Sequence, residues 1–252
     1  MKKKFSYLDA NTPIAFAHRG GAFDAPENSM AAFQSAINIG YRYLETDVHS
    51  TSDGKVIAFH DHVLDRVTNM NGKVAGTPYS LIQHALIDEQ SPIPLLVELL
   101  EAFPEARFNI DPKDDQVVGP LSEIITNTDS TDRICVSSFS DKRTREVSRL
   151  VGKRLCTGVG PSGVTRLRLG KLPLRLTRIP GECVQVPLTM AGVPLITPSF
   201  VERVHSVGKA IHAWTINDEE KMHYLIDIGV DGIMTDKPNL LKAVLNERGL
   251  WY

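Results

Sequence analysis

The sequence has few cysteines, little net charge and no long apolar run. Its 252 residues include three cysteines, Cys135, Cys156 and Cys183, too scattered and odd in number for a disulfide framework. We therefore expect a reducing, cytoplasmic compartment and three buried, unreactive thiols. The formal net charge of −2 gives no field that favours nucleic acid, so no nucleic-acid partner is expected. No apolar run approaches a membrane span in length.

Short strand-like runs alternate with amphipathic stretches along the chain. The β-rich runs are 14–17, 43–48, 56–59, 107–110, 134–138, 155–159, 183–186, 210–215 and 232–235. Most are separated by helical patterns, such as 29–39 and 218–228, which carry apolar residues on one face and are followed by a glycine. This alternation predicts a parallel sheet with helices outside. If 56–59 pairs with 43–48 as an antiparallel hairpin, eight βα units remain, the closure number of a TIM (β/α)8 barrel.

No linker or low-complexity tract divides the chain. We predict a single domain, 1–252, because α/β barrels of this length form one unit. The stretch 62–105 contains turn signals such as Asn71-Gly72 but no clear barrel strand. We expect it to be a small insertion after the second strand that ends in a helix at 95–102.

Carboxylates follow two of the predicted strands, at the end where a barrel places its active site. Glu45 and Asp47 point to the same side because strand side chains alternate, and Asp111 follows the next barrel strand. Carboxylates this close repel one another unless a cation neutralises them. Oxygen ligands without a thiolate suit Mg²⁺ or Ca²⁺. The alternative is a polar layer that Arg19 and Lys113 neutralise by ion pairing.

Two histidines stand at strand ends around these carboxylates. His18 ends the first strand and His60 ends the hairpin strand. Histidine titrates nearest to neutral pH, so the two form a candidate acid–base pair. His49 and His62 are neighbouring candidates of lower rank.

Two cations and one indole complete the candidate site. Arg19 and Lys113 fit a clamp on phosphate, because arginine binds oxyanions through two hydrogen bonds and lysine adds a point charge. Trp214, at the end of the seventh barrel strand, could form an apolar wall for a small substrate or could cap the core.

The segment from 147 to 181 contains eight basic residues and no acidic ones. Five of the basic side chains lie among leucines in 166–178: Arg166, Arg168, Lys171, Arg175 and Arg178. One interpretation is a solvated helix face. The other is a basic lip that makes weak contact with an anionic membrane surface.

Taken together in order, these motifs resemble the glycerophosphodiester phosphodiesterase family. The resemblance runs from residue 14 to about 245 and is specific as an ordered set. The matching segments are His18-Arg19-Gly20-Gly21, Pro26-Glu27-Asn28-Ser29, Glu45-Thr46-Asp47-Val48, Asp53-Gly54, His60-Asp61, Leu64-Asp65-Arg66, Asn109-Ile110-Asp111-Pro112-Lys113, Ser137-Ser138-Phe139, Trp214-Thr215-Ile216-Asn217 and 229–238.

The resemblance implies a TIM barrel that hydrolyses a small phosphodiester to an alcohol and glycerol 3-phosphate. Residue by residue, it assigns one divalent cation to Glu45, Asp47 and Asp111, phosphate contacts to Arg19 and Lys113, and acid–base catalysis to His18 and His60. Asp111 departs from the family, which most often has glutamate there. Two alternatives share the barrel: a phosphodiesterase directed at lysophospholipids or phosphoinositides, and a non-catalytic binder of phosphate ligands.

Overall fold

Eight parallel strands form a nearly closed barrel. The computed structural model describes residues 5–10, 13–169 and 179–251. In chain order the barrel strands are β1 (Ile14–Ala17), β2 (Tyr43–Ser50), β6 (Arg107–Pro112), β7 (Ile134–Val136), β8 (Cys156–Thr157), β9 (Cys183–Pro187), β12 (Ala210–Trp214) and β13 (Gly232–Thr235). Their order in the sheet is β8-β7-β6-β2-β1-β13-β12-β9, and a bridge between Gly158 and Cys183 joins its two ends. The TIM barrel predicted from the strand–helix alternation is therefore confirmed.

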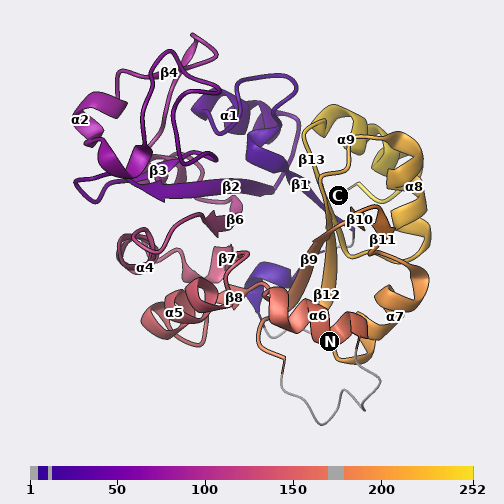
Figure 1. The fold of residues 1–252 in the computed structure, drawn as a ribbon. Coiled ribbons are helices and arrows are strands. Elements are labelled where there is room, and N and C mark those ends of the chain that lie inside the picture. The colour runs from indigo at the N-terminus through magenta and orange to yellow at the C-terminus, as the bar shows by residue number, and fades with distance from the viewer. Residues whose placement is uncertain (1–4, 11–12, 170–178, 252) are drawn as a thin grey trace.

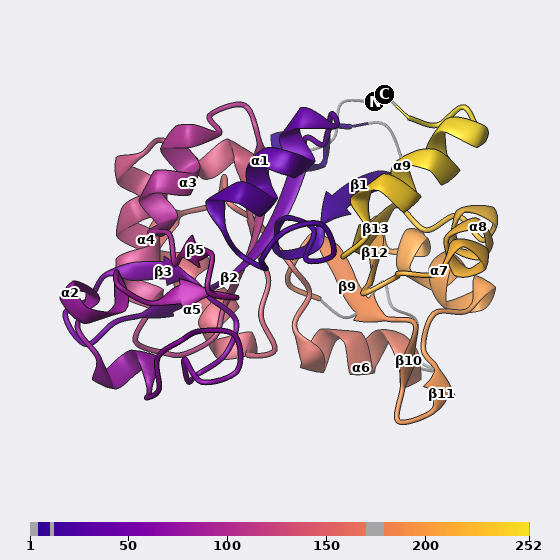
Figure 2. The same cartoon turned by 90° about the horizontal axis from the view of Figure 1, so that it is seen from above.

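A helix follows each barrel strand and lies on the outside (Figures 1 and 2). In chain order these helices are α1 (Met30–Asn38), α3 (Leu96–Ala102), α4 (Val118–Asn127), α5 (Asp141–Val151), α6 (Pro161–Leu169), α7 (Pro198–Ser206), α8 (Glu219–Asp227) and α9 (Pro238–Glu247). Ser29 caps α1 by accepting the backbone N–H of Ala32, and Asp218 caps α8 by accepting that of Lys221. The predicted helices at 29–39 and 218–228 are confirmed to within one residue at each end.

The apolar core has an outer and an inner part. The outer part packs the strands against the surrounding helices. The inner part fills the barrel with Phe16, Tyr43, Met234 and the three cysteines. The 3-10 turn η1 (Ser6–Leu8) covers this inner part, where the carbonyl of Tyr7 accepts the hydroxyl of Tyr43 at 2.6 Å. The prediction that the cysteines are buried is confirmed.

The chain between β2 and α3 forms a side lobe (Figure 1). β3 (Val56–Ala58) pairs antiparallel with β2, which confirms the predicted hairpin. The lobe continues with η3 (Val74–Gly76), α2 (Tyr79–Ile82) and the pair β4 (Leu86–Ile87) and β5 (Ser91–Pro92), around an apolar cluster of its own. By contrast, α3 packs into the barrel core through Leu96 and Leu99. The helix expected to end the insertion thus belongs to the barrel.

Several strand bounds differ from those expected. β2 continues to Ser50 and buries His49, because the hairpin with β3 extends its pairing. β7 and β8 end before the runs 134–138 and 155–159 do, since their last residues turn toward the following helices. The hairpin of β10 (Thr189–Met190) and β11 (Val193–Pro194), and the turn η4 (Thr131–Arg133), have no counterpart in the sequence-based expectation. None of the described helices is long and apolar enough to cross a membrane.

Candidate active site

The predicted site residues meet at the C-terminal ends of the barrel strands. β1 leads into the 3-10 turn η2 (His18–Gly20), β2 carries Glu45 and Asp47, and β6 carries Asp111. Asp47 and Asp111 are register partners on adjacent parallel strands, so their side chains leave the sheet next to each other. The structure therefore brings three carboxylates to the end of the barrel where catalytic groups of this fold lie.

The backbone of η2 directs Arg19 across the carboxylates. Arg19 and Gly20 both have left-handed backbones, with φ of 53° and 82°, and a Cβ on Gly20 would lie 2.8 Å from atoms of α1. The Arg19 N–H donates to Oε2 of Glu45 at 3.1 Å. Its guanidinium donates to Glu27 at 3.0 Å and lies 3.2 Å from Oδ2 of Asp47. One residue thus contacts three carboxylates, which requires the tight turn that Gly20 permits.

Glu45 and Asp47 are almost completely buried and differ in their electrostatics. Burial, and secondly the charge of Asp47, raise the pKa of Glu45 to about 7. Burial also raises the pKa of Asp47, but the cations Lys113 and Arg19 outweigh it and hold that pKa below its usual value. Glu45 and Asp47 would therefore both be fully ionised at neutral pH only if further positive charge lay beside them.

Lys113 supplies part of that charge. Its Nζ lies 2.7 Å from Oδ1 of Asp47 and 3.0 Å from Oδ2 of Asp111. Burial, only partly offset by Lys113, raises the pKa of Asp111. The ion-paired polar layer, which was the alternative to a cation site, is thus present, with Arg19 and Lys113 as its cations. In addition, the carboxylate oxygens of Glu45, Asp47 and Asp111 do not all lie within 4.8 Å of one another. The donor set, two buried carboxylates and the partly exposed Asp111, still fits a hard divalent cation in kind.

His18 is held by a carboxylate from the last barrel strand. Its Nδ1 lies 2.6 Å from Oδ1 of Asp236, and Oδ2 of Asp236 accepts the side-chain amide of Asn217 at 2.7 Å. The Nε2 of His18 lies 3.7 Å from Oε2 of Glu45. Burial lowers the pKa of His18, but the charge of Glu45 and the hydrogen bond to Asp236 outweigh it and raise that pKa. The ring is oriented with Nε2 facing the carboxylates.

His60 is held in the same manner from the opposite side. Its Nδ1 lies 2.5 Å from Oδ1 of Asp61, which is also paired with Arg66. Arg66 donates to Oε1 of Glu27 at 2.6 Å, and Glu27 contacts Arg19. Burial lowers the pKa of His60 more than the charge of Asp47 raises it. A continuous chain of ion pairs therefore links the two sides of the site.

Of the two lower-ranked histidines, His49 supports the backbone of His60. His49 is 1% exposed, and its Nδ1 lies 2.9 Å from Oδ2 of Asp114. Its Nε2 lies 3.1 Å from the carbonyl oxygen of His60. The His62 ring packs edge-on against His49, with 4.9 Å between the centroids. His49 is fully occupied in holding the loop, so its contacts are structural.

Trp214 borders a pocket next to His18's partners. The pocket is lined by Trp214, Asn217, Pro187, Thr189 and Lys221, among others, and Asn217 also holds Asp236. The ring of the exposed Phe139 meets Trp214 edge-on at 5.7 Å. Trp214 therefore lies at the wall of a pocket and also packs against the inner core.

The basic segment is only partly described. Arg166 and Arg168 lie on α6, and the Arg168 guanidinium stacks over Phe200 at 5.9 Å and donates to the carbonyl of Pro194 at 3.2 Å. Lys171, Arg175 and Arg178 lie outside the described residues. The membrane-contact hypothesis therefore stays a prediction.

Several residues that hold the site lie in the motif segments of the sequence, but no individual role could be assigned to them from the sequence. They are Glu27, Asn28, Asp61, Arg66, Asn217 and Asp236. Asn28, at a left-handed φ of 56°, accepts the hydroxyl of Thr46 at 2.8 Å and donates to Asp47 at 3.4 Å. The position of Asp236 directly after the last barrel strand could have indicated that it belongs to the site. For the other residues, the only indication in the sequence was that they belong to a motif.

Comparison with known proteins gives consistent matches. The profile of the glycerophosphoryl diester phosphodiesterase family matches residues 18–240. A probable glycerophosphodiester phosphodiesterase 2 of Mycobacterium tuberculosis is 39% identical over 246 residues, which cover 94% of this chain and 92% of that protein. A lysophospholipase D of Rattus norvegicus is 29% identical, over 97% of this chain and 88% of that protein.

Solved structures share the fold. A phosphodiesterase of Oleispira antarctica, solved with the product sn-glycerol-3-phosphate, superposes with a TM-score of 0.79 at 22% identity, over 93% of this chain and 97% of that one. A further structure, from Silicibacter pomeroyi, has a TM-score of 0.83 at 23% identity and covers 98% of this chain and 99% of that one.

Proposed function

The chain belongs to the glycerophosphoryl diester phosphodiesterase family, and we propose that its site performs the family's hydrolysis of glycerophosphodiesters with a divalent cation and two histidines. The chain is thus a phosphoric diester hydrolase that acts on a small glycerophosphodiester. One observation carries the proposal. His18 and His60 are each anchored through Nδ1 to a carboxylate, and they act electrostatically on Glu45 and on Asp47 respectively.

Glu45, Asp47 and Asp111 would hold the cation, since they are carboxylates of adjacent strands at the barrel mouth and the pKa values of Glu45 and Asp111 are raised. A bound Mg²⁺ or Ca²⁺ supplies positive charge that stabilises the charge developing on the phosphate oxygens. Asp111 reaches one methylene less far than a glutamate. Its register beside Asp47 supports the same role for the shorter side chain.

Arg19 and Lys113 bind the phosphate. Both already lie beside Asp47, so their charges face the place where a phosphodiester would meet the carboxylates. A guanidinium offers two parallel donors to a phosphate, and an ammonium offers a compact charge. Together they orient the substrate and withdraw charge from the phosphorus as it is attacked.

The two histidines move the protons of the reaction. One Nε2 accepts a proton from an attacking water molecule, whose oxygen bonds to phosphorus. The other Nε2 donates a proton to the leaving oxygen as its bond to phosphorus breaks, which gives an alcohol and glycerol 3-phosphate. The carboxylates of Asp236 and Asp61 keep each Nδ1 side occupied, so the reactive nitrogen of each ring faces the substrate.

The pocket beside Trp214 receives part of the substrate. It adjoins His18 through Asn217 and Asp236. Its lining mixes an indole with Thr189, Asn217 and Lys221, which suits a small hydroxylated or polar group.

A second candidate substrate is a lysophospholipid. Exposed apolar side chains stand on loops that follow the C-terminal ends of β1, β7 and β9. These residues are Phe23, Phe139, Met190 and Val193, each at least 59% exposed. Apolar groups gathered around a site favour a partner with an apolar part. A relative at 29% identity is a lysophospholipase D.

A turnover assay tests the proposal. Glycerophosphocholine, glycerophosphoethanolamine, glycerophosphoinositol and a lysophospholipid are each supplied with Mg²⁺, with Ca²⁺ and with EDTA. We expect hydrolysis of the glycerophosphodiesters that depends on the cation. We also expect loss of turnover in His18→Ala and His60→Ala, but not in the control His84→Ala, whose side chain is exposed in the lobe. Normal turnover by either active-site variant would reject the acid–base assignment. A preference for the lysophospholipid would favour the second candidate.

A further inference from the structure

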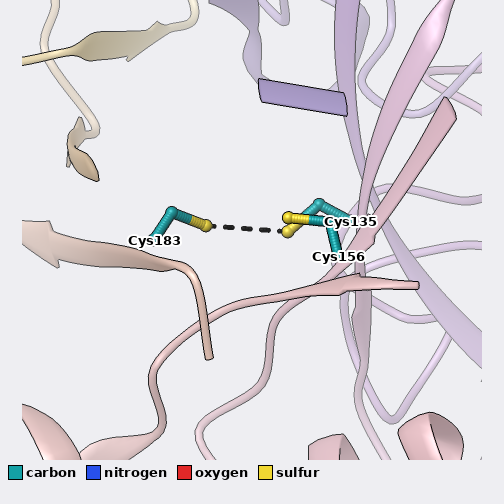
Figure 3. A group of neighbouring side chains, drawn as sticks. All are labelled: Cys135, Cys156 and Cys183. Carbon is teal, nitrogen blue, oxygen red and sulfur yellow. Dashed lines mark hydrogen bonds between the residues drawn. The ribbon is translucent and has the colours of Figure 1, made fainter. Parts of the chain in front are cut away.

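Three thiols from three neighbouring strands meet inside the barrel (Figure 3). The Sγ atoms of Cys135 on β7, Cys156 on β8 and Cys183 on β9 all lie within 4.8 Å of one another. The Sγ atoms of Cys135 and Cys183 are 3.7 Å apart. Each cysteine is at most 1% exposed. We call these residues the three-thiol cluster.

Two buried polar atoms beside the cluster have no hydrogen-bond partner among the described residues. These atoms are the hydroxyl of Tyr7 and Nε2 of His212, whose residues are 1% and 0% exposed. All three thiols act electrostatically on the Tyr7 hydroxyl, and the His212 ring interacts with the Cys183 thiol. The Tyr7 hydroxyl and the His212 ring therefore lie close to the sulfurs.

The surroundings fix the His212 ring in that position. The side-chain amide nitrogen of Gln185 lies 3.2 Å from Nδ1 of His212, so Nδ1 accepts and Nε2 carries the proton. Phe16 packs at 5.0 Å from the ring centroid, and a Cβ on Gly232 would come within 2.8 Å of the ring. The His212 Nε2–H and the Tyr7 O–H are thus two buried donors facing weak acceptors, an arrangement that proteins rarely leave uncompensated.

We propose that the three-thiol cluster binds one thiophilic cation of the Zn²⁺ or Cu⁺ class through three thiolates, with Tyr7 and His212 donating hydrogen bonds to the bound sulfurs. Three atoms within 4.8 Å of one another share a point no more than about 2.8 Å from each, and a Zn–S bond measures about 2.3 Å. Binding releases the three thiol protons to solvent. The thiolates that remain are strong acceptors, which gives both unpaired donors a partner.

The three-thiol cluster differs from the candidate active site in its ligands, and an ion bound there would be structural. It shares no residue with the carboxylates, and soft thiolates select a different class of ion from carboxylate oxygens. It also lies where the barrel is least well joined. β8 has two residues, and β8 meets β9 only at the bridge of Gly158 with Cys183. A cation bound by Cys135, Cys156 and Cys183 would fasten β7, β8 and β9 across that seam.

Metal analysis of the full chain tests the proposal. The protein is produced under reducing conditions in medium with Zn²⁺ or, in a second arm, with Cu⁺, and is then passed through EDTA to remove ions from open sites. We expect about one thiophilic ion per chain, since the three thiols are at most 1% exposed and a chelator in solution has no direct access to an ion among them. A Co²⁺-loaded sample should show the ultraviolet charge-transfer band of thiolate ligation. Cys156→Ser and Cys183→Ala should lose both signals.

Three outcomes would overturn the proposal: no retained ion in either arm, an ion retained in both cysteine variants, or an ion lost in Glu45→Gln and therefore bound at the carboxylates. Circular dichroism establishes that each variant is folded, and hydrolytic turnover gives a second check for the two cysteine variants only. If Cys156→Ser fails to fold, Cys183→Ala decides, because alanine keeps the apolar character of the position.

Discussion

His18 and Asp236 are separated by 218 positions, yet Nδ1 of the first lies 2.6 Å from Oδ1 of the second. The contact exists because β1 and β13 are neighbours in the barrel, with Ala17 paired to Thr235. Closure of the barrel therefore supplies the group that orients a candidate catalytic histidine. This contact can be tested in the proposed mechanism, because Asp236 can be substituted while the His18 ring, which would transfer the proton, is kept.

Asp236→Asn should lower kcat by about 10²-fold, the order of one acid–base contribution, and should change KM little. The amide keeps the shape but cannot hold the imidazole with the same charge and tautomer. Steady-state kinetics check this result. Asp24→Asn, an exposed carboxylate on the same face that accepts from Asn239, is the matched control and should leave kcat unchanged. A normal kcat for Asp236→Asn would show that His18 needs no such support.

Glu27→Gln should raise KM for a glycerophosphodiester about tenfold, equivalent to about 1.4 kcal/mol. Glu27 joins Arg19 to Arg66, so its loss frees the guanidinium that binds phosphate and weakens the hold on Asp61. Kinetics with varied substrate concentration give the result. Glu89→Gln, an exposed carboxylate in the lobe that carries Arg66, serves as the control. An unchanged KM would mean that Arg19 does not bind the phosphate in the way proposed.

Removal of the divalent cation should abolish hydrolysis without unfolding the chain. Glu45, Asp47 and Asp111 are already partly neutralised by Arg19 and Lys113, so the fold does not depend on the ion at this place. Turnover is measured in EDTA and again after Mg²⁺ or Ca²⁺ is added back, with circular dichroism alongside. Full turnover in excess EDTA would contradict the proposed cation.

The pair of His49 and Asp114 should make stability depend on pH in the acid range. Burial raises the pKa of Asp114, but the hydrogen bonds from His49 and the Val117 N–H outweigh it and hold that pKa below 3.8. A carboxyl whose pKa is lowered by folding stabilises the folded state above its unfolded pKa, and the effect disappears as pH falls through the folded pKa. Asp114→Asn should therefore cost about 1–2 kcal/mol at pH 7. Urea unfolding should show that the difference shrinks as the pH falls below the usual range in which an aspartate titrates.

Gly232→Ala should destabilise the barrel by about 1–3 kcal/mol, as overpacking of a rigid interior does. An added Cβ would lie 2.8 Å from both the His212 ring and Phe16. Chemical denaturation measures the loss. Gly54→Ala gives a comparison at a glycine with open space around it but a positive φ of 80°, so it separates crowding from backbone strain. Gly232 lacks a positive φ, so Gly232→Ala reports crowding and Gly54→Ala reports backbone strain. An unchanged stability of Gly232→Ala would show that the interior accommodates the added methyl group.

The sequence predicts best what is local or periodic. Glu45 and Asp47 are two residues apart on one strand, so their shared direction follows from the chain alone. Lys113, two residues after Asp111, could likewise be placed beside it. The Asp236 carboxylate could not be assigned to His18, because only barrel closure makes them neighbours. Nor could the convergence of Cys135, Cys156 and Cys183, since their distance depends on strand register and on the barrel's stagger.

The lobe that carries His60 has an apolar cluster separate from that of the barrel. Leu64, Val74 and Ile87 lie in that cluster, while Asp61 and Arg66 connect the lobe to the rest of the site. If His60 moves a proton as proposed, the apolar residues that position it differ from those that hold the barrel together. Substitutions inside the lobe would then alter the rate of the reaction while the barrel stays as it is.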